Sequence, residues 1–239
     1  MAPQTKASDL KGVAGSVIAA LTSHRQIPTF SSRPNGLTLA QAYRVIPLLR
    51  AAFEARGEKI TGRKIGFTNH EMWKVYGVEA PIWGYVTDQT TRELAHVQIQ
   101  SIKNFVEPRI EPEIMFGLKA APWAGMNEAA LLDCVEWVSL GYEIVQSIFP
   151  GWKFTAADTV AANGVHGALL VGKRHAIAPQ CGKQRATYYS ITSSISASSE
   201  GESTKPSACA FFRLSTTGNF VGCSTGRSAG FAPLRILST

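Results

Sequence analysis

Apolar residues recur at three- and four-residue intervals in two stretches near the N-terminus, which predicts two amphipathic helices. The first stretch carries its apolar stripe at Leu10, Val13, Val17, Ile18 and Leu21. In the second stretch, the stripe consists of Ala42, Val45, Ile46, Leu49 and Phe53. Thr38 stands where it can N-cap the second helix, and Gly57 stands where that helix should end.

Shorter apolar segments, typical of strands, follow the second helix. Strand-like runs lie at 64–68, 82–87, 106–118 and 142–149. Between the last two runs, a third helix is predicted from Asn127 to about Ser139. The small apolar residues of 160–172 indicate a packed strand or a glycine-rich approach to a site.

Composition and charge narrow the class of protein. Of 239 residues, 45% are hydrophobic and 17% are charged, so the chain can bury a core as one domain, or as one domain with a small helical appendage. The net charge of +7 is uneven, because six basic and two acidic residues after position 174 supply +4 of it. The body carries no clustered Lys/Arg stripe, so we expect no nucleic-acid partner. No apolar run reaches membrane-spanning length and four cysteines are too few for a disulfide scaffold, so we expect a cytoplasmic protein with no membrane contact.

Two carboxylates share one face of the strand predicted over 106–118. Because strand side chains alternate, Glu111 and Glu113 point the same way, about 6.6 Å apart. At an effective dielectric near 20, two unit charges at that distance repel by roughly 2.5 kcal/mol. A cation between them would remove this cost, and all-oxygen ligands favour Mg²⁺ or Mn²⁺. A solvated strand face explains the pair equally well, and Pro112 between them requires an edge or irregular strand.

Two further charged residues lie in segments that are otherwise fit for burial. Glu143 sits inside an apolar strand-like run, so it needs a partner, which a metal shared with Glu111 and Glu113 or a basic side chain would supply. Lys64 lies between glycines and apolar residues. It could hold a substrate carboxylate or shuttle a proton, and a surface lysine in a turn is the alternative interpretation.

Lys153, Asp158 and His166 form a third set of polar candidates. Asp158 could cap a turn, orient Lys153 or face a site. His166 is interpreted as a packed histidine rather than an acid–base group. The string from Gly222 to Gly226 matches the G-x-S-x-G pattern of serine hydrolases, but it lacks the preceding buried strand and the following helix that a nucleophile elbow needs.

Several of these segments, in order and at matching spacing, resemble the 2-keto-4-pentenoate hydratase / 4-oxalocrotonate decarboxylase family of the fumarylacetoacetate hydrolase superfamily. The resemblance covers most of residues 27–173. It is carried by Gly62-Arg63-Lys64-Ile65-Gly66-Phe67-Thr68, Pro81-Ile82-Trp83-Gly84, Pro108-Arg109-Ile110-Glu111-Pro112-Glu113-Ile114, Tyr142-Glu143-Ile144-Val145, Trp152-Lys153-Phe154 and Ala157-Asp158-Thr159-Val160-Ala161.

The resemblance implies a function and a ligand set. Glu111, Glu113 and Glu143 would ligate Mg²⁺ or Mn²⁺, and Lys64 would lie in the substrate pocket, with Lys153 and Asp158 as further catalytic candidates. The metal would stabilise the enolate of a small 2-oxo acid substrate. The apolar character around Ile82, where hydratases should carry an acidic residue, favours a decarboxylase. A hydratase, a C–C bond hydrolase of a diketo acid and a catalytically impaired binding subunit are the alternatives.

The resemblance also implies an α+β fold, in which N-terminal helices pack on a mixed β-roll of the fumarylacetoacetate hydrolase type. We expect a helical lobe over 1–60, a metal-binding core over 61–174 and an atypical Ser/Thr-rich tail over 175–239, which makes the C-terminal part aberrant or incomplete. The tail does not resemble the strands that complete the β-roll. A frameshift is the hypothesis we favour for it, and a disordered low-complexity tail is the alternative. Departures from the family pattern are Gln146, Ala162 and the pair Val165-His166, which put the substrate in question. Family members lead us to expect a homo-oligomer or a hydratase–decarboxylase complex.

Overall fold

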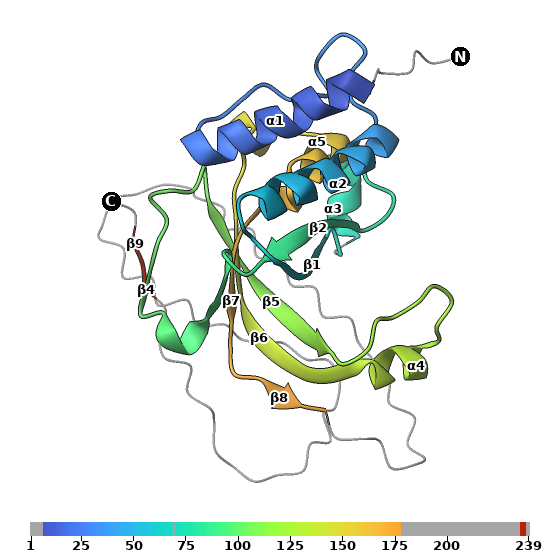
Figure 1. Cartoon of the computed structure of the whole chain (residues 1–239), viewed down its shortest axis with the longest axis vertical. Coiled ribbons are helices and arrows are strands. Elements are labelled where there is room, and N and C mark those ends of the chain that lie inside the picture. The colour runs from blue at the N-terminus through green and yellow to red at the C-terminus, as the bar shows by residue number, and fades with distance from the viewer. Residues whose placement is uncertain (1–6, 69, 178–234, 238–239) are drawn as a thin grey trace.

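A computed structural model of the chain describes residues 7–68, 70–177 and 235–237 (Figure 1). The α-helices of these ranges are α1 (Ala7–Ser23), α2 (Leu39–Ala55), α3 (Glu71–Tyr76), α4 (Glu128–Asp133) and α5 (Ala156–Ala161). Short 3₁₀ turns are η1 (Leu94–His96), η2 (Pro150–Trp152) and η3 (Asn163–Val165). The strands are β1 (Ile60–Gly66), β2 (Ile82–Thr87), β3 (Thr91–Glu93), β4 (Ile99–Ser101), β5 (Arg109–Leu118), β6 (Val135–Val145), β7 (His166–Val171), β8 (His175–Ala176) and β9 (Arg235–Leu237).

The two N-terminal helices form as their apolar stripes predict. In α2, the buried residues are Ala42, Val45, Ile46, Leu49 and Phe53, which are the five residues of the predicted stripe. Thr38 and Gln41 form a reciprocal capping box at its start, and Gly57 follows its end with a positive φ of 83°. Helix α1 buries Leu10, Val13 and Val17 against the same core.

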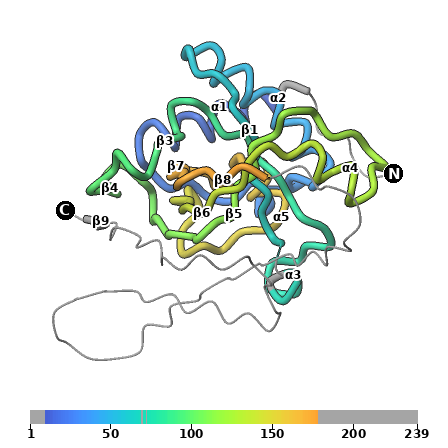
Figure 2. The backbone as a smooth tube through the Cα atoms, turned by 90° about the horizontal axis from the view of Figure 1, so that it is seen from below, coloured from blue at the N-terminus to red at the C-terminus, as the bar shows by residue number. Residues whose placement is uncertain are grey.

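The main sheet is mixed, with the strand order β3-β7-β6-β5 and β8 paired to the far end of β6. Strand β6 pairs antiparallel with both β5 and β7, whereas β3 pairs parallel with β7. Strands β1 and β2 form a separate antiparallel pair, and β4 pairs parallel with β9. Figure 2 shows β5, β6 and β7 side by side at the centre of the molecule. Within the described part of the chain β5 is an edge strand, which is the kind of position that Pro112 requires.

The predicted third helix is wrong over its second half. Helix α4 covers Glu128–Asp133, and the chain enters strand β6 at Val135. Asn127 caps α4 by accepting a hydrogen bond from the Ala130 amide at 2.9 Å, as its position at the predicted start suggests. The residues after Cys134 pair with the end of β5 instead, because β-branched and aromatic side chains such as Trp137 and Val138 suit a strand that has a partner.

The packed strand considered for 160–172 forms only over the second half of that segment, and the glycine-rich approach to a site, the other possibility considered, is found at Gly164 beside Lys64. The segment contains the end of α5, then η3, and only from His166 the strand β7. A capping box between Thr155 and Asp158 starts α5, and its side chains face the core. The apolar and small character of the segment therefore reflects a buried helix and turn as well as a strand.

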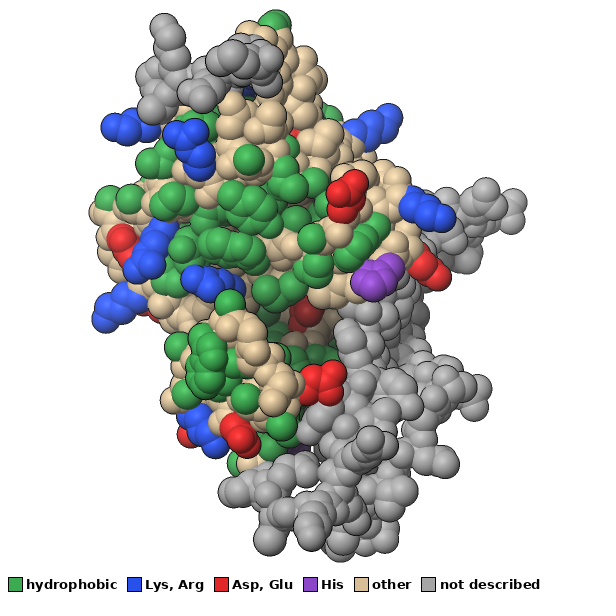
Figure 3. Space-filling view, turned by 90° about the vertical axis from the view of Figure 1, so that its right-hand side faces the viewer, with side chains coloured by type: hydrophobic (Ala, Val, Ile, Leu, Met, Phe, Trp, Pro, Cys, Tyr) green, Lys and Arg blue, Asp and Glu red, His purple; other side chains and the backbone are tan. Residues whose placement is uncertain are grey.

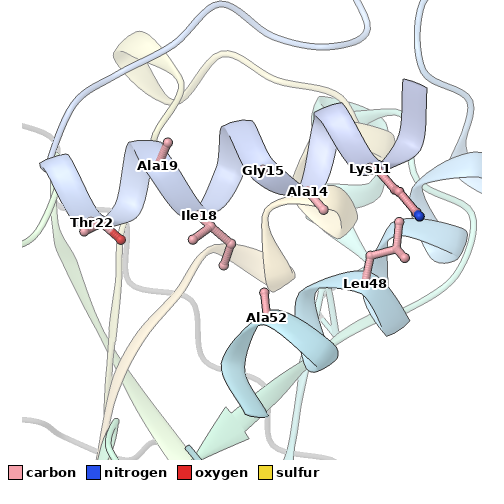
Figure 4. Close-up of a pocket in the computed structure, with 8 residues that line it drawn as sticks. All are labelled: Lys11, Ala14, Gly15, Ile18, Ala19, Thr22, Leu48 and Ala52. Carbon is pink, nitrogen blue, oxygen red and sulfur yellow. The ribbon is translucent and has the colours of Figure 1, made fainter. Parts of the chain in front are cut away.

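One apolar core joins the helices to the strands beneath them. Most of its members come from α1, α2, β2 and α5, and Ile148 and Phe149, which are 1% and 0% exposed, also belong to it. The helical layer therefore includes α5 as well as the residues expected to form a lobe over 1–60 (Figure 1). An open groove of about 510 Å³ lies between α1 and α2 (Figure 4). Apart from Lys11 and Thr22, its lining is apolar, and none of the candidate site residues contributes to it.

Most of the expectations for the tail lie outside the described residues. They concern the reading frame of the Ser/Thr-rich stretch, the cysteines Cys181, Cys209 and Cys223, and the segment from Gly222 to Gly226. Within the described ranges, no helix combines the length and the apolar character that crossing a lipid bilayer requires.

Candidate metal centre

The pairing of β5 with β6 brings three carboxylates together. Glu111 lies directly opposite Glu143 in the antiparallel ladder, and Glu113 lies two residues further on the same face, opposite Gly141. One oxygen from each of the three carboxylates lies within 4.8 Å of the others. Glu111 is exposed, Glu113 is partly buried and Glu143 is fully buried, so the cluster extends from the surface into the interior. Figure 3 shows acidic side chains at a hollow between the helical half of the molecule and its lower part.

Lys64 reaches this cluster from β1. Its ammonium group lies 3.1 Å from Oε2 of Glu143 and donates a hydrogen bond of 3.0 Å to the carbonyl oxygen of Gly164. Only 8% of the lysine side chain is exposed, so the interpretation as a surface lysine is wrong. Two glycines make the approach possible: a Cβ at Gly164 would lie 2.9 Å from Cδ of Lys64, and a Cβ at Gly84 would lie 2.2 Å from the carbonyl oxygen of Asn163.

His166 binds the other oxygen of Glu143. Its Nδ1 lies 2.7 Å from Oε1, and its Nε2 lies 2.9 Å from the hydroxyl of Thr90. The imidazole is buried, with 3% of the side chain exposed. Sequence reasoning treated His166 as a packed histidine, and it did not foresee that the ring would contact a carboxylate of the cluster. The signal available was a polar residue in a segment of small and apolar residues that is otherwise fit for burial.

The turn η3 places both of these partners. Asn163, Gly164 and Val165 have positive φ values of 57°, 65° and 56°, so three successive residues adopt the left-handed conformation. The Asn163 side chain fixes the turn to β2, because it accepts from the Tyr85 amide at 2.7 Å and donates to the Tyr85 carbonyl at 2.9 Å. The conformation is costly for Val165, because β-branched residues rarely adopt positive φ. The strained turn directs the Gly164 carbonyl toward Lys64 and begins β7 at His166.

The charges of the cluster are unevenly compensated. Burial raises the pKa of Glu113 to about 7, and the neighbouring charges of Glu143 and Glu111 add to the effect while Lys64 opposes it. Burial and the Glu143 charge also raise the pKa of Glu111, although part of its side chain reaches solvent. Burial opposes ionisation of Glu143, but Lys64 and His166 outweigh it, so the pKa of Glu143 is lowered.

The pairing with Glu143 also changes the pKa of Lys64, which is raised. Burial lowers it, but the charges of Glu143 and Glu111 outweigh burial and leave a net rise. Glu143 and Lys64 therefore form a buried ion pair, while Glu111 and Glu113 have no comparably close cation among the described residues. A divalent cation would supply the missing positive charge, and three carboxylate oxygens are ligands that Mg²⁺ and Mn²⁺ accept. The residues present fit such an ion.

Asp158 and Lys153 are not joined to this cluster. Oδ1 of Asp158 accepts from the amides of Phe30 and Ser31 at 2.8 and 2.9 Å, and Oδ2 accepts from the Ser31 hydroxyl and from the amide and hydroxyl of Thr155. The buried carboxylate thus caps α5 and ties it to the loop before α2, which is the cap role considered for it. Lys153 is exposed, and no hydrogen bond or ion pair links it to the described carboxylates.

Comparison with known proteins places these features in a family. The chain is 32% identical over 157 residues to a 2-hydroxyhexa-2,4-dienoate hydratase of Comamonas testosteroni, a match that covers 65% of this chain and 60% of that protein. It is 30% identical over 162 residues to a 2-hydroxypent-2,4-dienoate hydratase of Pseudomonas putida, covering 67% and 72% of the two chains. A 4-oxalocrotonate decarboxylase of Pseudomonas sp is 30% identical over 142 residues, covering 59% and 54%. No family model matches the chain.

A solved structure shares the fold. The 4-oxalocrotonate decarboxylase of Pseudomonas putida G7, complexed with magnesium and adipate, superimposes with a TM-score of 0.67 at 25% identity, covering 71% of this chain and 64% of that one. The chain is thus a mixed α/β protein that shares the fold of this decarboxylase and carries a cluster of three carboxylates. The chain belongs to the 2-keto-4-pentenoate hydratase / 4-oxalocrotonate decarboxylase family, whose named members are lyases. It spans 60% of the length of the Comamonas hydratase.

Proposed function

We propose that this chain is a divalent-metal-dependent lyase that acts on unsaturated 2-oxo acids, with 4-oxalocrotonate decarboxylation as its activity. The observation that carries the proposal is the convergence of Glu111, Glu113 and Glu143 within 4.8 Å, with the buried cation of Lys64 beside them. The three carboxylates would hold Mg²⁺ or Mn²⁺. When bound, such an ion supplies Lewis-acid stabilisation of negative charge that develops on a substrate oxygen.

The chain's own residues would bind and orient the substrate. Two contacts of the Lys64 ammonium group are fixed, by Gly164 and Glu143, and a substrate carboxylate could be its third partner. Because Lys64 and Glu143 are largely removed from water, their charges act at a lower effective dielectric than surface groups would. His166 and Thr90 lie on the side of Glu143 away from Lys64 and would keep that carboxylate in place.

The environment of Lys64 favours decarboxylation over hydration. Ile82 and Lys64 both lie next to Gly66: a Cβ placed on this glycine would be 3.3 Å from a side-chain carbon of Ile82 and 3.8 Å from Nζ of Lys64. Ile82 is 3% exposed and offers no polar atom, so it cannot hold a water molecule for addition to a double bond. Hydration remains the second candidate, because the named relatives include hydratases at 30% and 32% identity.

The test is turnover of an unsaturated 2-oxo diacid, 2-oxo-3-hexenedioate, by the purified chain with Mg²⁺ or Mn²⁺, followed by ultraviolet absorbance and product analysis. Carbon dioxide release supports the decarboxylase, and a 4-hydroxy product favours the hydratase. Cleavage to two shorter acids would indicate a C–C bond hydrolase, and binding without turnover would indicate an impaired binding subunit.

Two glutamate variants make the test specific for the metal centre. Glu113→Gln should lose metal uptake, whereas Glu128→Gln, at an exposed position on α4, should behave as the wild type. If the wild type took up no divalent cation, the proposed function would fail. The expected homo-oligomer or hydratase–decarboxylase complex is tested separately, by light scattering on the isolated chain and after mixing it with a hydratase.

A further inference from the structure

Both oxygens of the Glu143 carboxylate are held by side chains of this protein. His166 contacts Oε1 at 2.7 Å, and Lys64 contacts Oε2 at 3.1 Å. The two partners come from different strands, β7 and β1, and approach the carboxylate at opposite oxygens. Because an ionised carboxylate can only accept hydrogen bonds, the Nδ1 atom of His166 must carry the proton in this contact. Glu143 therefore cannot rotate without breaking a buried contact.

The far end of the imidazole is also fixed. Nε2 contacts the hydroxyl of Thr90 at 2.9 Å. That hydroxyl is itself held by Thr87, because it accepts from the Thr87 amide and donates to the Thr87 carbonyl, both at 3.2 Å. The turn between β2 and β3 thus holds one side of the ring while Glu143 holds the other. His166 spans the distance between this turn and the carboxylate cluster as a rigid spacer.

The backbone of His166 is equally constrained. The residue directly follows η3, whose Asn163 side chain is fixed to both polar groups of the Tyr85 backbone. Its own strand pairs with β6, where His166 lies opposite Val145 next to an irregularity in the ladder. The position of the imidazole is thus determined by three strands and a strained turn, which is more than packing of a core histidine requires.

We propose that His166 is a positioning residue of the metal centre: by holding one oxygen of Glu143 while Lys64 holds the other, it fixes the carboxylate in the orientation that binds a divalent cation. The inference rests on the proposed metal centre. Side chains that orient a ligating carboxylate or imidazole typically contribute a factor of 10 to 100 to metal affinity, because a ligand held in place loses less freedom on binding.

Substitutions that separate the two nitrogen contacts test this role. The amide nitrogen of asparagine lies about where Nδ1 of histidine lies, and that of glutamine reaches about as far as Nε2. Titration of the full chain with Mn²⁺, measured by calorimetry, should show an affinity 10- to 100-fold weaker for His166→Ala. His166→Asn, which keeps a donor for Glu143, should bind within about threefold of the wild type. His166→Gln, whose amide reaches Thr90 but no longer Glu143, should bind about as weakly as His166→Ala.

A control variant separates positioning from loss of fold. Ser147 is buried and its hydroxyl donates to the Phe149 carbonyl at 2.6 Å, away from the carboxylates, so Ser147→Ala should lower the melting temperature in EDTA without weakening Mn²⁺ binding. Equal Mn²⁺ affinity for His166→Ala and the wild type would overturn the inference and leave the metal centre standing. Equal weakening by the Asn and Gln variants, or by Ser147→Ala, would also overturn it. Absence of Mn²⁺ uptake by the wild type would overturn the metal centre itself.

Discussion

Replacing Glu113 with glutamine should make the metal-free protein more stable at pH 8. The pKa of Glu113 is raised from 4.5 to about 7 by burial and by the neighbouring carboxylates, so the folded protein resists ionisation of this group. At about 1.4 kcal/mol per pKa unit, the shift corresponds to an upper bound of about 3 kcal/mol. Because Glu113 is partly accessible to solvent, we expect about 1–2 kcal/mol for Glu113→Gln, which removes the charge but keeps the shape.

The sign of the effect fixes its pH dependence. The unfolded chain ionises near pH 4.5, whereas the folded protein keeps the proton until about pH 7, so the wild type loses stability as the pH rises between these values. Urea unfolding in EDTA, followed by tryptophan fluorescence, should therefore show a gain for Glu113→Gln at pH 8 that becomes small at pH 5. The exposed Glu128→Gln serves as the control. A Glu113→Gln variant that is no more stable than the wild type at pH 8, or that gains equally at both pH values, would refute the argument.

Three further predictions concern the same cluster and its surroundings. The affinity for Mn²⁺, measured by calorimetry, should fall about tenfold from pH 8 to pH 6, because a proton competes with the metal for Glu113 as the pH falls through 7. An affinity that does not change with pH would contradict this. Lys64→Met should lower the free energy of unfolding by about 3–5 kcal/mol, because it leaves the Glu143 charge with one fewer partner. Saturating Mn²⁺ should restore part of this loss. A loss under about 1 kcal/mol would count against the ion pair. Asp158→Ala should destabilise the fold by about 3 kcal/mol, because it leaves buried amides without an acceptor, and it should leave the Mn²⁺ affinity unchanged. Weaker Mn²⁺ binding by a variant of full stability would instead indicate that Asp158 acts at the metal centre.

The helices at the N-terminus could be predicted because their signal is local. The stripe of α2 is a property of seventeen consecutive residues, and its cap at Thr38 is read from the same segment. The strand at 135–139 could not be predicted in this way. Its apolar residues continue the helical spacing of α4, and the chain forms a strand there because β5, the strand before α4, is available as a partner. The choice is made by tertiary pairing rather than by periodicity.

The candidate site shows the same division. Alternation within one strand is enough to place Glu111 and Glu113 on a common face. The burial of Glu143 in an apolar segment predicts that it needs a partner, but not which one. Both Lys64 and His166 supply contacts, and they arrive from strands whose register and strained preceding turn no local pattern specifies. For Asp158 the sequence leaves a cap and a site role open, and the structure adds the five hydrogen-bond donors that account for the cap.

The register of the β5–β6 hairpin also decides which changes in the gene this protein can tolerate. Glu111 faces Glu143 across the ladder, so inserting or deleting one residue within either strand would turn a carboxylate to the opposite side of the sheet. A point substitution keeps the register, although Gly117 and Gly141 do not accept a side chain: a Cβ there would lie 1.9 Å from the Trp137 ring and 2.1 Å from the Leu170 carbonyl oxygen, respectively. Variation in length should therefore be confined to the connection over 119–134, where an added or missing residue moves α4 and leaves the three acids in place.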